Sequence, residues 1–256
     1  MNTASDDNVP TDWPDEAPVY GGAQSLLDMS KIKAISLDLD DTLWPIWPII
    51  TRAEKVLLSW LAEHAPEAAK LAASPQILRH LREEMFKNRP DLANDMSALR
   101  RESIRLLLIR SGEDPALAEP AFEVFFAERQ RVELYEDALP ALEFLSARYP
   151  LVAISNGNAD IERVGLGSYF KAAFSAHRFG EGKPHSRIFH AAAQAVSVSP
   201  DQVLHIGDDA HLDAVGGMNA GMQVAWLNRD GLDWTHGPRQ PHVTVSGLAA
   251  LCAHWG

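Results

Sequence analysis

The sequence predicts an α/β protein in which a doubly wound, parallel sheet is interrupted by an α-helical insertion. From Pro140 onward, short apolar runs alternate with stretches of helical periodicity, as in a parallel sheet covered by helices on both faces. Between Thr42 and that region, the apolar residues follow helical spacing, with no strand between the helices. The hydrophobic fraction of 46% is ample for a buried core.

The first 28 residues differ from the rest in composition. They are polar and acidic, and Pro10, Pro14 and Pro18 interrupt them. A segment of this kind buries too little apolar surface to order itself, so we expect a mobile tail. Trp13 and Tyr20 are the side chains in it that can dock on the body of the protein.

The first expected strand covers residues 32–37, an apolar run that ends in acidic residues. The later apolar runs are short and are separated by helical stretches, which is typical of a parallel sheet. The remaining expected strands are residues 151–154, 173–175, 203–206, 224–227 and 243–245, and a helix is expected at residues 142–149.

The helical region carries start and stop signals of its own. Ser74-Pro75 and Asp114-Pro115 each place a capping residue before a proline at the first helical position. Gly112 is well placed to end a helix. We therefore expect a helical cap at residues 46–137, called the helical insertion below, between the two parts of a core at residues 29–45 and 138–256.

The charge balance argues against a nucleic-acid partner. The chain has 23 basic and 35 acidic residues, which gives a net charge of −12, and its pI is about 5.2. Proteins that bind nucleic acids usually carry a basic surface or stripe. The arginine-rich stretches are interleaved with acids and are expected to be solvated helix faces: Arg100, Arg101, Arg105, Arg129 and Arg131.

The single cysteine, Cys252, excludes an internal disulfide and a cysteine-cluster metal site, and it fits a reducing compartment. No apolar run approaches the ~20 residues that a membrane helix needs. The N-terminus lacks the basic start and apolar core of a signal peptide. We expect a cytoplasmic protein with no membrane partner, and the sequence does not indicate its oligomeric state.

The most informative segment is residues 35–43, Ile-Ser-Leu-Asp-Leu-Asp-Asp-Thr-Leu. Burying an unpaired carboxylate is very costly, so these acids must lie where the strand leaves the sheet. Asp38 and Asp40 are two residues apart and point to the same side of an extended chain. Converging carboxylates repel each other unless a cation or a shared proton holds them. The segment predicts a metal site or an acid/base site.

Polar clusters also follow two later strands. Ser155-Asn156-Gly157 follows residues 151–154, and a run containing Asp208, Asp209 and Asp213 follows residues 203–206. Between them, the Gly-Lys-Pro loop supplies Lys183. Parallel sheets bind ligands beyond the carboxyl ends of their strands, where the strand order reverses. Carboxylates, a hydroxyl, an amide and an ammonium at one edge suit Mg²⁺ together with a phosphate.

These motifs, in this order and at this spacing, resemble the four motifs of the haloacid dehalogenase (HAD) superfamily, and the resemblance extends from about residue 32 to residue 245. The segments Pro-Leu-Val-Ala-Ile-Ser-Asn-Gly-Asn and His-Ile-Gly-Asp-Asp resemble the bacterial riboflavin-pathway phosphatases. Those enzymes act on FMN and on 5-amino-6-(5-phosphoribitylamino)uracil phosphate. The resemblance implies a Rossmann-like catalytic core, a helical cap and Mg²⁺-dependent hydrolysis of a small-molecule phosphate ester.

The resemblance also implies residue roles. Asp38 would be the nucleophile that forms an aspartyl-phosphate. The Asp38 carboxylate, the Asp40 backbone carbonyl and the Asp208 carboxylate would bind Mg²⁺. Asp209 and Asp213 would orient the waters of the metal and Lys183.

The remaining implied roles concern the proton and the phosphate. Asp40 would protonate the leaving alkoxide and later accept a proton from the attacking water. Lys183 would neutralise charge on the phosphate and on the nucleophile. Phosphate oxygens would be held by Thr42, Ser155 and the backbone amides of Asn156 and Gly157.

Several alternatives stay open at this point. Asp40 disfavours a dehalogenase, because a halide leaving group needs no proton. A phosphatase for nucleotides or sugar phosphates remains possible, as does a binding module without catalysis. The chain has Trp44-Pro45-Ile46 where the riboflavin-pathway phosphatases are expected to carry Tyr-Asp-Asn, which leaves the leaving-group specificity open.

Seven further residues have both a functional and an ordinary interpretation. Arg89, Arg100 and Arg101 are the substrate-contact candidates in the helical insertion, with surface charge as the favoured alternative. Trp44 and Trp47 are expected to pack against the first cap helix rather than to stack on a substrate. His205 is expected to be a hydrogen-bonded histidine at a strand end, and His211 is not expected to bind the metal.

Overall fold

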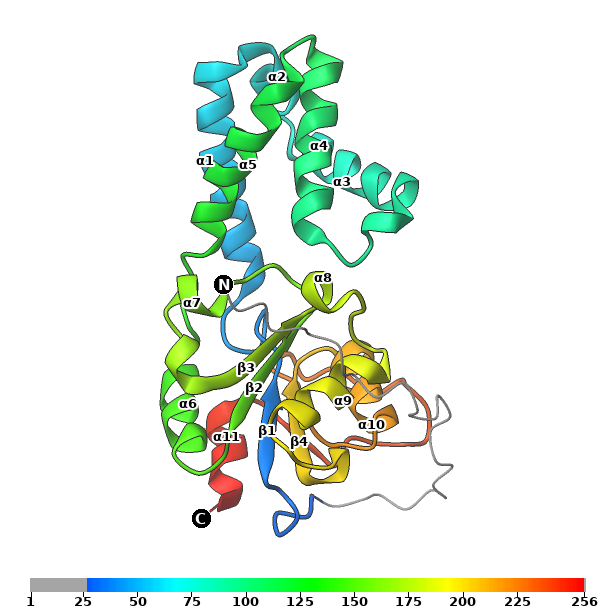
Figure 1. Cartoon of the computed structure of the whole chain (residues 1–256). Coiled ribbons are helices and arrows are strands. Elements are labelled where there is room, and N and C mark those ends of the chain that lie inside the picture. The colour runs from blue at the N-terminus through cyan, green and yellow to red at the C-terminus, as the bar shows by residue number, and fades with distance from the viewer. Residues whose placement is uncertain (1–26, 256) are drawn as a thin grey trace, which may run out of the picture.

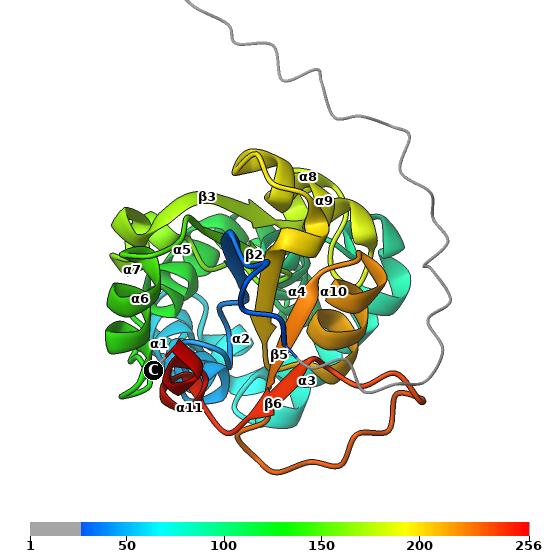
Figure 2. The ribbon, with the colours of Figure 1, turned by 90° about the horizontal axis from the view of Figure 1, so that it is seen from below.

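The computed structural model of the chain describes residues 27–255, and a six-stranded sheet lies at the centre of them (Figures 1 and 2). The strands are β1 (Ala34–Leu37), β2 (Leu151–Ser155), β3 (Phe170–Ser175), β4 (Val203–Gly207), β5 (Gln223–Leu227) and β6 (Val243–Val245). All neighbours are parallel, in the order β3-β2-β1-β4-β5-β6. The chain builds outward from β1 in one direction and then in the other, so the predicted doubly wound sheet is confirmed.

Side chains alternate between the two faces along each strand, and both faces carry apolar side chains. Helices therefore cover both faces of the sheet. Ile35 and Leu37 pack with Leu142 and Leu248 on one face, while Ala34 packs with Ile188 on the other. The helices of this part are α6 (Ala138–Ser146), α7 (Ile161–Val164), α8 (Ala176–Phe179), α9 (Ser186–Ala195), α10 (Gly216–Asn219) and α11 (Leu248–Cys252), with the short 3-10 helices η3 (Gly167–Tyr169), η4 (Pro200–Gln202) and η6 (Ala253–Trp255) and the π-helix η5 (Ala210–Val215).

The helices of the helical insertion lie beyond the carboxyl end of β1 (Figure 1). Their own cluster of buried side chains includes Leu57, Leu61, Phe122 and Phe125. Within residues 27–255, no helix is both long enough and apolar enough to cross a membrane. The insertion contains α1 (Ile46–His64), α2 (Pro66–Leu71), α3 (Pro75–Asn88), α4 (Met96–Ser111) and α5 (Ala118–Arg129), with turns η1 (Pro90–Leu92) and η2 (Pro115–Leu117).

The predicted helix boundaries hold in the insertion and shift at α6. Gly112 ends α4 with a φ of 74°, and the Asp114 side chain accepts a hydrogen bond from the Ala116 backbone at the start of η2. Helix α6 spans residues 138–146 instead of 142–149, because Pro140 fits in its first turn, where a backbone donor is not needed. The expected tail lies outside the described residues except for residues 27 and 28.

Candidate active site

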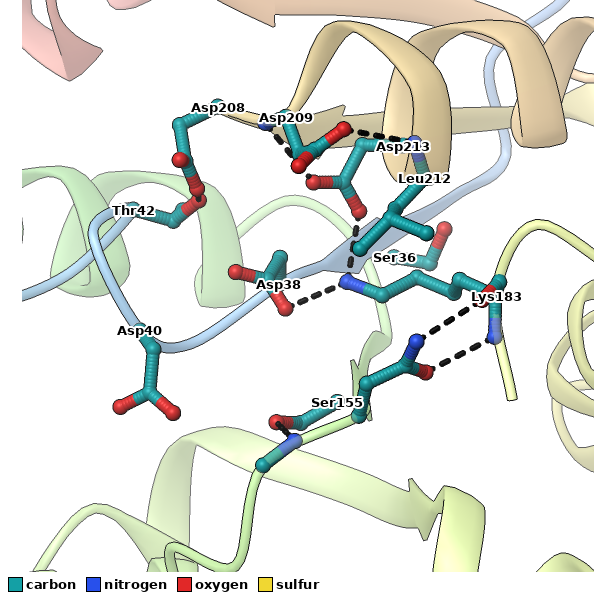
Figure 3. A network of polar contacts seen from close by, with 12 residues as sticks. Ser36, Asp38, Asp40, Thr42, Ser155, Lys183, Asp208, Asp209, Leu212 and Asp213 are labelled. Carbon is teal, nitrogen blue, oxygen red and sulfur yellow. Dashed lines mark hydrogen bonds and ion pairs between the residues drawn. The ribbon is translucent and has the colours of Figure 1, made fainter. Parts of the chain in front are cut away.

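Asp38 lies at the carboxyl end of β1, and only 6% of its surface is exposed. Its backbone N–H donates to the Ile206 carbonyl at 2.9 Å, which extends the ladder between β1 and β4 to this residue. Lys183 Nζ donates to Asp38 Oδ1 and, at 2.6 Å, to Asp213 Oδ1 (Figure 3). A buried ammonium therefore lies between two buried carboxylates, and the predicted strand-end acid and loop lysine do meet.

A third carboxylate completes this cluster. Asp208 follows β4, and its Oδ1 accepts a hydrogen bond from Thr42 Oγ1 at 3.0 Å. Asp38, Asp208 and Asp213 each offer one oxygen, and these oxygens lie within 4.8 Å of one another. Three carboxylates around one ammonium leave an excess of negative charge. Because Mg²⁺ prefers oxygen ligands, the donor set fits this ion.

The pKa values follow the same imbalance. Burial, reinforced by the charge of Asp213, raises the pKa of Asp208 to about 7. Burial also raises the pKa of Asp38 well above its usual value, although Lys183 opposes this. Burial alone would raise the pKa of Asp213 as well, but Lys183 and His205 outweigh it and lower this pKa to about 2. Lys183 therefore offsets charge on both Asp38 and Asp213, while the pKa of Asp208 stays raised.

A buried chain of hydrogen bonds fixes Asp213. His205 Nε2 lies 3.0 Å from Asp213 Oδ1, and His205 Nδ1 lies 2.8 Å from Ser36 Oγ. Burial lowers the pKa of His205 despite the neighbouring carboxylate, so the ring is neutral, with Nε2 donating and Nδ1 accepting. The histidine is fully buried and hydrogen-bonded at both ring nitrogens, as expected, but it lies in the middle of β4 and not at the strand end.

The segment after β2 positions the lysine loop. The Asn156 side chain donates to the Lys183 carbonyl and accepts from the Lys183 backbone N–H, both at 2.8 Å. Ser155 Oγ, which is buried, accepts from the Gly157 backbone N–H at 2.9 Å. A Cβ at Gly157 would collide with Asp40 Oδ2, so this close approach requires glycine. The Asn156 side chain thus has a structural task that the sequence did not suggest.

Asp40 is held by partners that Asp38 does not have. Its Oδ1 accepts from Trp44 Nε1 at 2.8 Å, and Arg129 Nη2 donates to Oδ1 and Oδ2 at 2.7 and 2.8 Å. Figure 3 shows its carboxylate apart from the group formed by Asp38, Lys183 and Asp213, so the two acids do not converge on one partner as their spacing suggested. Trp44 is fully buried in the core, and its expected packing role is confirmed.

Arg129 corrects a sequence prediction. A solvated helix face was expected, but the side chain of Arg129 is 1% exposed. A positive charge is tolerated there because Asp40 compensates it. The signal was present in α5, since Arg129 continues the stripe of Ala118, Ala121 and Phe125 at helical spacing.

The other candidates are distributed as follows. The Asp209 carboxylate accepts from the backbone N–H groups of His211 and Leu212, so it caps the following turn.

Arg89 pairs with Asp91 at the surface, and Arg101 pairs with Glu119. Arg100 was also expected at the surface, but it is mostly buried and pairs with Glu54; burial, aided by Arg82, lowers its pKa to about 10. His211 is exposed and lies outside the acidic cluster, and Trp47 is 70% exposed.

A cavity of about 520 Å³ lies between the helical insertion and the acidic edge of the sheet. Asp40, Gly157 and Arg129 line its inner end, and Arg100 lines its wall. The cavity can therefore hold a group attached to a phosphate that sits near Asp38. Its apolar lining consists of Ile46, Trp47, Ile50, Phe86, Met96, Leu99 and Phe125.

The parallel sheet, its acidic carboxyl edge and the helices above it define a class of α/β hydrolases. The chain belongs to the haloacid dehalogenase-like hydrolase family, whose model matches residues 32–221. The predicted superfamily and the Rossmann-like fold are therefore confirmed.

Three relatives illustrate this membership. The chain is 32% identical to 5-amino-6-(5-phospho-D-ribitylamino)uracil phosphatase YigB of Escherichia coli (strain K12), over 87% of this chain and 96% of that protein. It is 35% identical, with a TM-score of 0.79, to the crystal structure of a 2-haloacid dehalogenase from Pseudomonas syringae pv. Tomato DC3000, over 88% and 100% of the two chains. The magnesium-bound HAD-hydrolase YfnB of Bacillus subtilis shares the fold at 20% identity, with a TM-score of 0.66 and coverage of 87% and 98%. The family and the phosphatase-named relative agree with the predicted enzyme class, a HAD-type phosphatase.

Proposed function

We propose that this chain is a Mg²⁺-dependent phosphomonoester hydrolase that acts through an aspartyl-phosphate at Asp38. The observation that carries the proposal is the different surroundings of the two acids at the end of β1. Asp38 contacts Lys183 and lies in the acidic cluster, which suits a nucleophile that needs a cation. Asp40 contacts Trp44 and Arg129 and lines the cavity, which suits an acid/base group beside a leaving group.

In the first half of the reaction, an Asp38 oxygen forms a bond to phosphorus as the bond from phosphorus to the ester oxygen breaks. Asp40 gives its proton to that alkoxide, and the alcohol leaves. In the second half, water attacks phosphorus, Asp40 takes the proton, and the bond to Asp38 breaks to release phosphate. Lys183 lies beside Asp38 throughout and offsets the charge that builds up there.

The carboxylates of Asp38 and Asp208 and the backbone carbonyl of Asp40 would hold Mg²⁺. When bound, the ion would reduce the repulsion between the Asp38 carboxylate and the phosphate dianion. Asp213 belongs to the same cluster, but Lys183 and His205 occupy its Oδ1, so its task is to hold the lysine. Thr42, Ser155 and the amides of Asn156 and Gly157 remain the candidates for phosphate contacts.

For the substrate we propose FMN or a phosphorylated riboflavin precursor, which would place the protein in riboflavin biosynthesis. The similarity to the uracil phosphatase YigB supports this, as does a cavity with aromatic and apolar walls and a buried arginine, Arg100. A nucleotide or a sugar phosphate is the alternative. The helical insertion, residues 46–137, would act as the cap over this cavity, and a cytoplasmic location stays a prediction.

Two further alternatives are weaker. The relative from Pseudomonas syringae is titled a 2-haloacid dehalogenase, but Asp40 supplies an acid that a halide leaving group does not require. A binding module without catalysis would need neither Asp40 nor the paired Lys183.

The deciding experiment measures phosphate release with and without Mg²⁺ from FMN, the phosphorylated pyrimidine precursor, nucleotides and sugar phosphates, with a 2-haloacid as an added substrate. We expect turnover of phosphate esters only with the metal, and highest kcat/KM for a flavin or its precursor. Halide release without phosphatase activity would favour a dehalogenase. Binding of a phosphate ester with no turnover would favour the binding module.

A further inference from the structure

Arg129 reaches the acid/base candidate from the last helix of the insertion, 89 positions away in the chain. A single nitrogen, Nη2, donates to both oxygens of Asp40, at 2.7 and 2.8 Å. With Trp44 Nε1 on Oδ1, this oxygen accepts two hydrogen bonds, whereas Oδ2 accepts one from the described residues. Because a carboxylate oxygen has two lone pairs, Oδ2 keeps one for a transferred proton.

The arginine is itself fixed by neighbours from the core. Arg129 Nε donates to Asn158 Oδ1 at 3.2 Å. The next residue, Gln130, bonds the Asn158 carbonyl and the Asp160 backbone N–H, at 3.3 and 2.8 Å. Asn158 Nδ2 also donates to Ser97 Oγ in the insertion, at 3.2 Å. The end of α5 is thereby held against the segment that follows β2, and the guanidinium has a defined place.

We propose that Arg129 is a positioning residue: carried by the helical insertion, it holds the Asp40 carboxylate with Oδ2 turned toward the ester oxygen of the substrate. The inference rests on the proposed phosphatase function. Proton transfer to the leaving group would then require the insertion to be packed against the core, whereas the attack by Asp38 would not. Arg129 and Asp40 both line the cavity that would hold this leaving group.

The alternative is an ion pair that only supports the fold. Leaving groups separate the two possibilities, because p-nitrophenolate departs without a proton while an aliphatic alkoxide needs one. A structural defect lowers turnover of both kinds of ester equally. A misplaced Asp40 lowers kcat/KM mainly for the aliphatic ester, because kcat/KM reports the steps up to the departure of the alcohol. Hydrolysis of the aspartyl-phosphate, in which Asp40 is the base, is the same for both esters.

The test compares p-nitrophenyl phosphate with FMN, or with the best aliphatic ester from the substrate panel, in the full chain with Mg²⁺. We expect Arg129→Met to lower kcat/KM on the aliphatic ester on the order of tenfold to a hundredfold, a share of what general acid catalysis supplies, and kcat/KM on the aryl ester less than about fivefold. Arg129→Lys keeps the charge without the planar guanidinium and should fall between Arg129→Met and the wild type. Added guanidinium chloride should restore part of the aliphatic activity in Arg129→Ala.

Arg131→Met is the matched control, since Arg131 lies two residues further along, is 78% exposed at its side chain and pairs with Glu128. It should leave both activities unchanged. Equal losses of kcat/KM on the two esters in both Arg129→Met and Arg129→Lys, with no rescue by guanidinium, would overturn the positioning role, and so would unchanged kcat/KM on both. A wild-type protein that hydrolyses neither ester would remove the proposed function itself and this inference with it.

Discussion

Replacement of Lys183 by methionine tests the electrostatic account of the site. The Lys183 ammonium contacts Asp38 and Asp213. All three residues are buried, with exposed fractions of 4% for Lys183, 6% for Asp38 and 1% for Asp213. Removing one partner of a buried ion pair typically costs about 3–5 kcal/mol, because the remaining charge is buried without compensation. For a protein of this size each kcal/mol lowers Tm by roughly 2–4 °C, so we expect a loss of about 6–20 °C in metal-free buffer.

The loss should depend on pH with a defined sign. The pKa of Asp208 is about 7, and that of Asp38 is also raised by burial. A carboxyl group whose pKa is higher in the folded state favours folding at low pH and loses this contribution as pH rises through the folded pKa. Without Lys183 these pKa values rise further, and the pKa of Asp213 is no longer lowered. The difference between Lys183→Met and the wild type should therefore be larger at pH 8 than at pH 5.

The assay is thermal unfolding followed by circular dichroism at pH 5 and pH 8, in EDTA and in excess Mg²⁺. Lys70→Met is the control, because Lys70 is an exposed lysine whose partner Glu67 is also exposed. It should leave Tm unchanged at both pH values. A Lys183→Met variant as stable as the wild type at pH 8 in EDTA would refute the view that this lysine compensates the buried carboxylates.

Three other outcomes are expected. Asp38→Asn should abolish phosphate release and Asp40→Asn should nearly abolish it, and the far-ultraviolet circular dichroism spectrum of each variant should match that of the wild type. Normal turnover by Asp38→Asn would refute the assignment of Asp38 as the nucleophile. Mg²⁺ binds the folded state, so at a concentration 100 times its Kd it should add about 2.7 kcal/mol to the free energy of unfolding and thereby raise the wild-type Tm. Asp208→Asn should lose most of this rise in Tm. Burial, then Arg239, lowers the pKa of His242 to about 4, and its Nδ1 accepts from the Val224 backbone N–H. The wild type should thus lose stability as pH falls from about 6.5 toward 4, and His242→Gln should lose less between pH 7 and 4.5 in urea unfolding.

The sheet could be predicted closely because its central strands are buried, so their sequences are short apolar runs bounded by polar residues. The main discrepancy is β3, which starts at Phe170 instead of residue 173. This strand lies at the edge of the sheet, where several of its positions are partly exposed and the apolar signal is weak.

The candidate site was predictable where it depends on strand ends. Asp38 and Asp208 follow neighbouring parallel strands, so sequence alone indicated that their carboxylates share an edge. Lys183 was assigned to the same site because it lies in the Gly-Lys-Pro loop. Arg129 was missed because the charged residues around it, Glu128 and Arg131, are typical of a solvated helix face. It continues the apolar stripe of α5, but its burial depends on how α5 meets the core.

The sequence by itself determined the order of the strands along the chain, the helical insertion and the placement of Asp38 and Asp40 at the end of β1. These features were predictable because burial and backbone geometry produce local patterns of apolar and polar residues. Only the tertiary structure decided the partners of these two acids. Asp38 receives Lys183 from 145 positions away, and Asp40 receives Arg129 from 89 positions away. Contacts over such separations depend on how the lysine loop and the last helix of the insertion pack against the sheet, and no local pattern specifies that packing.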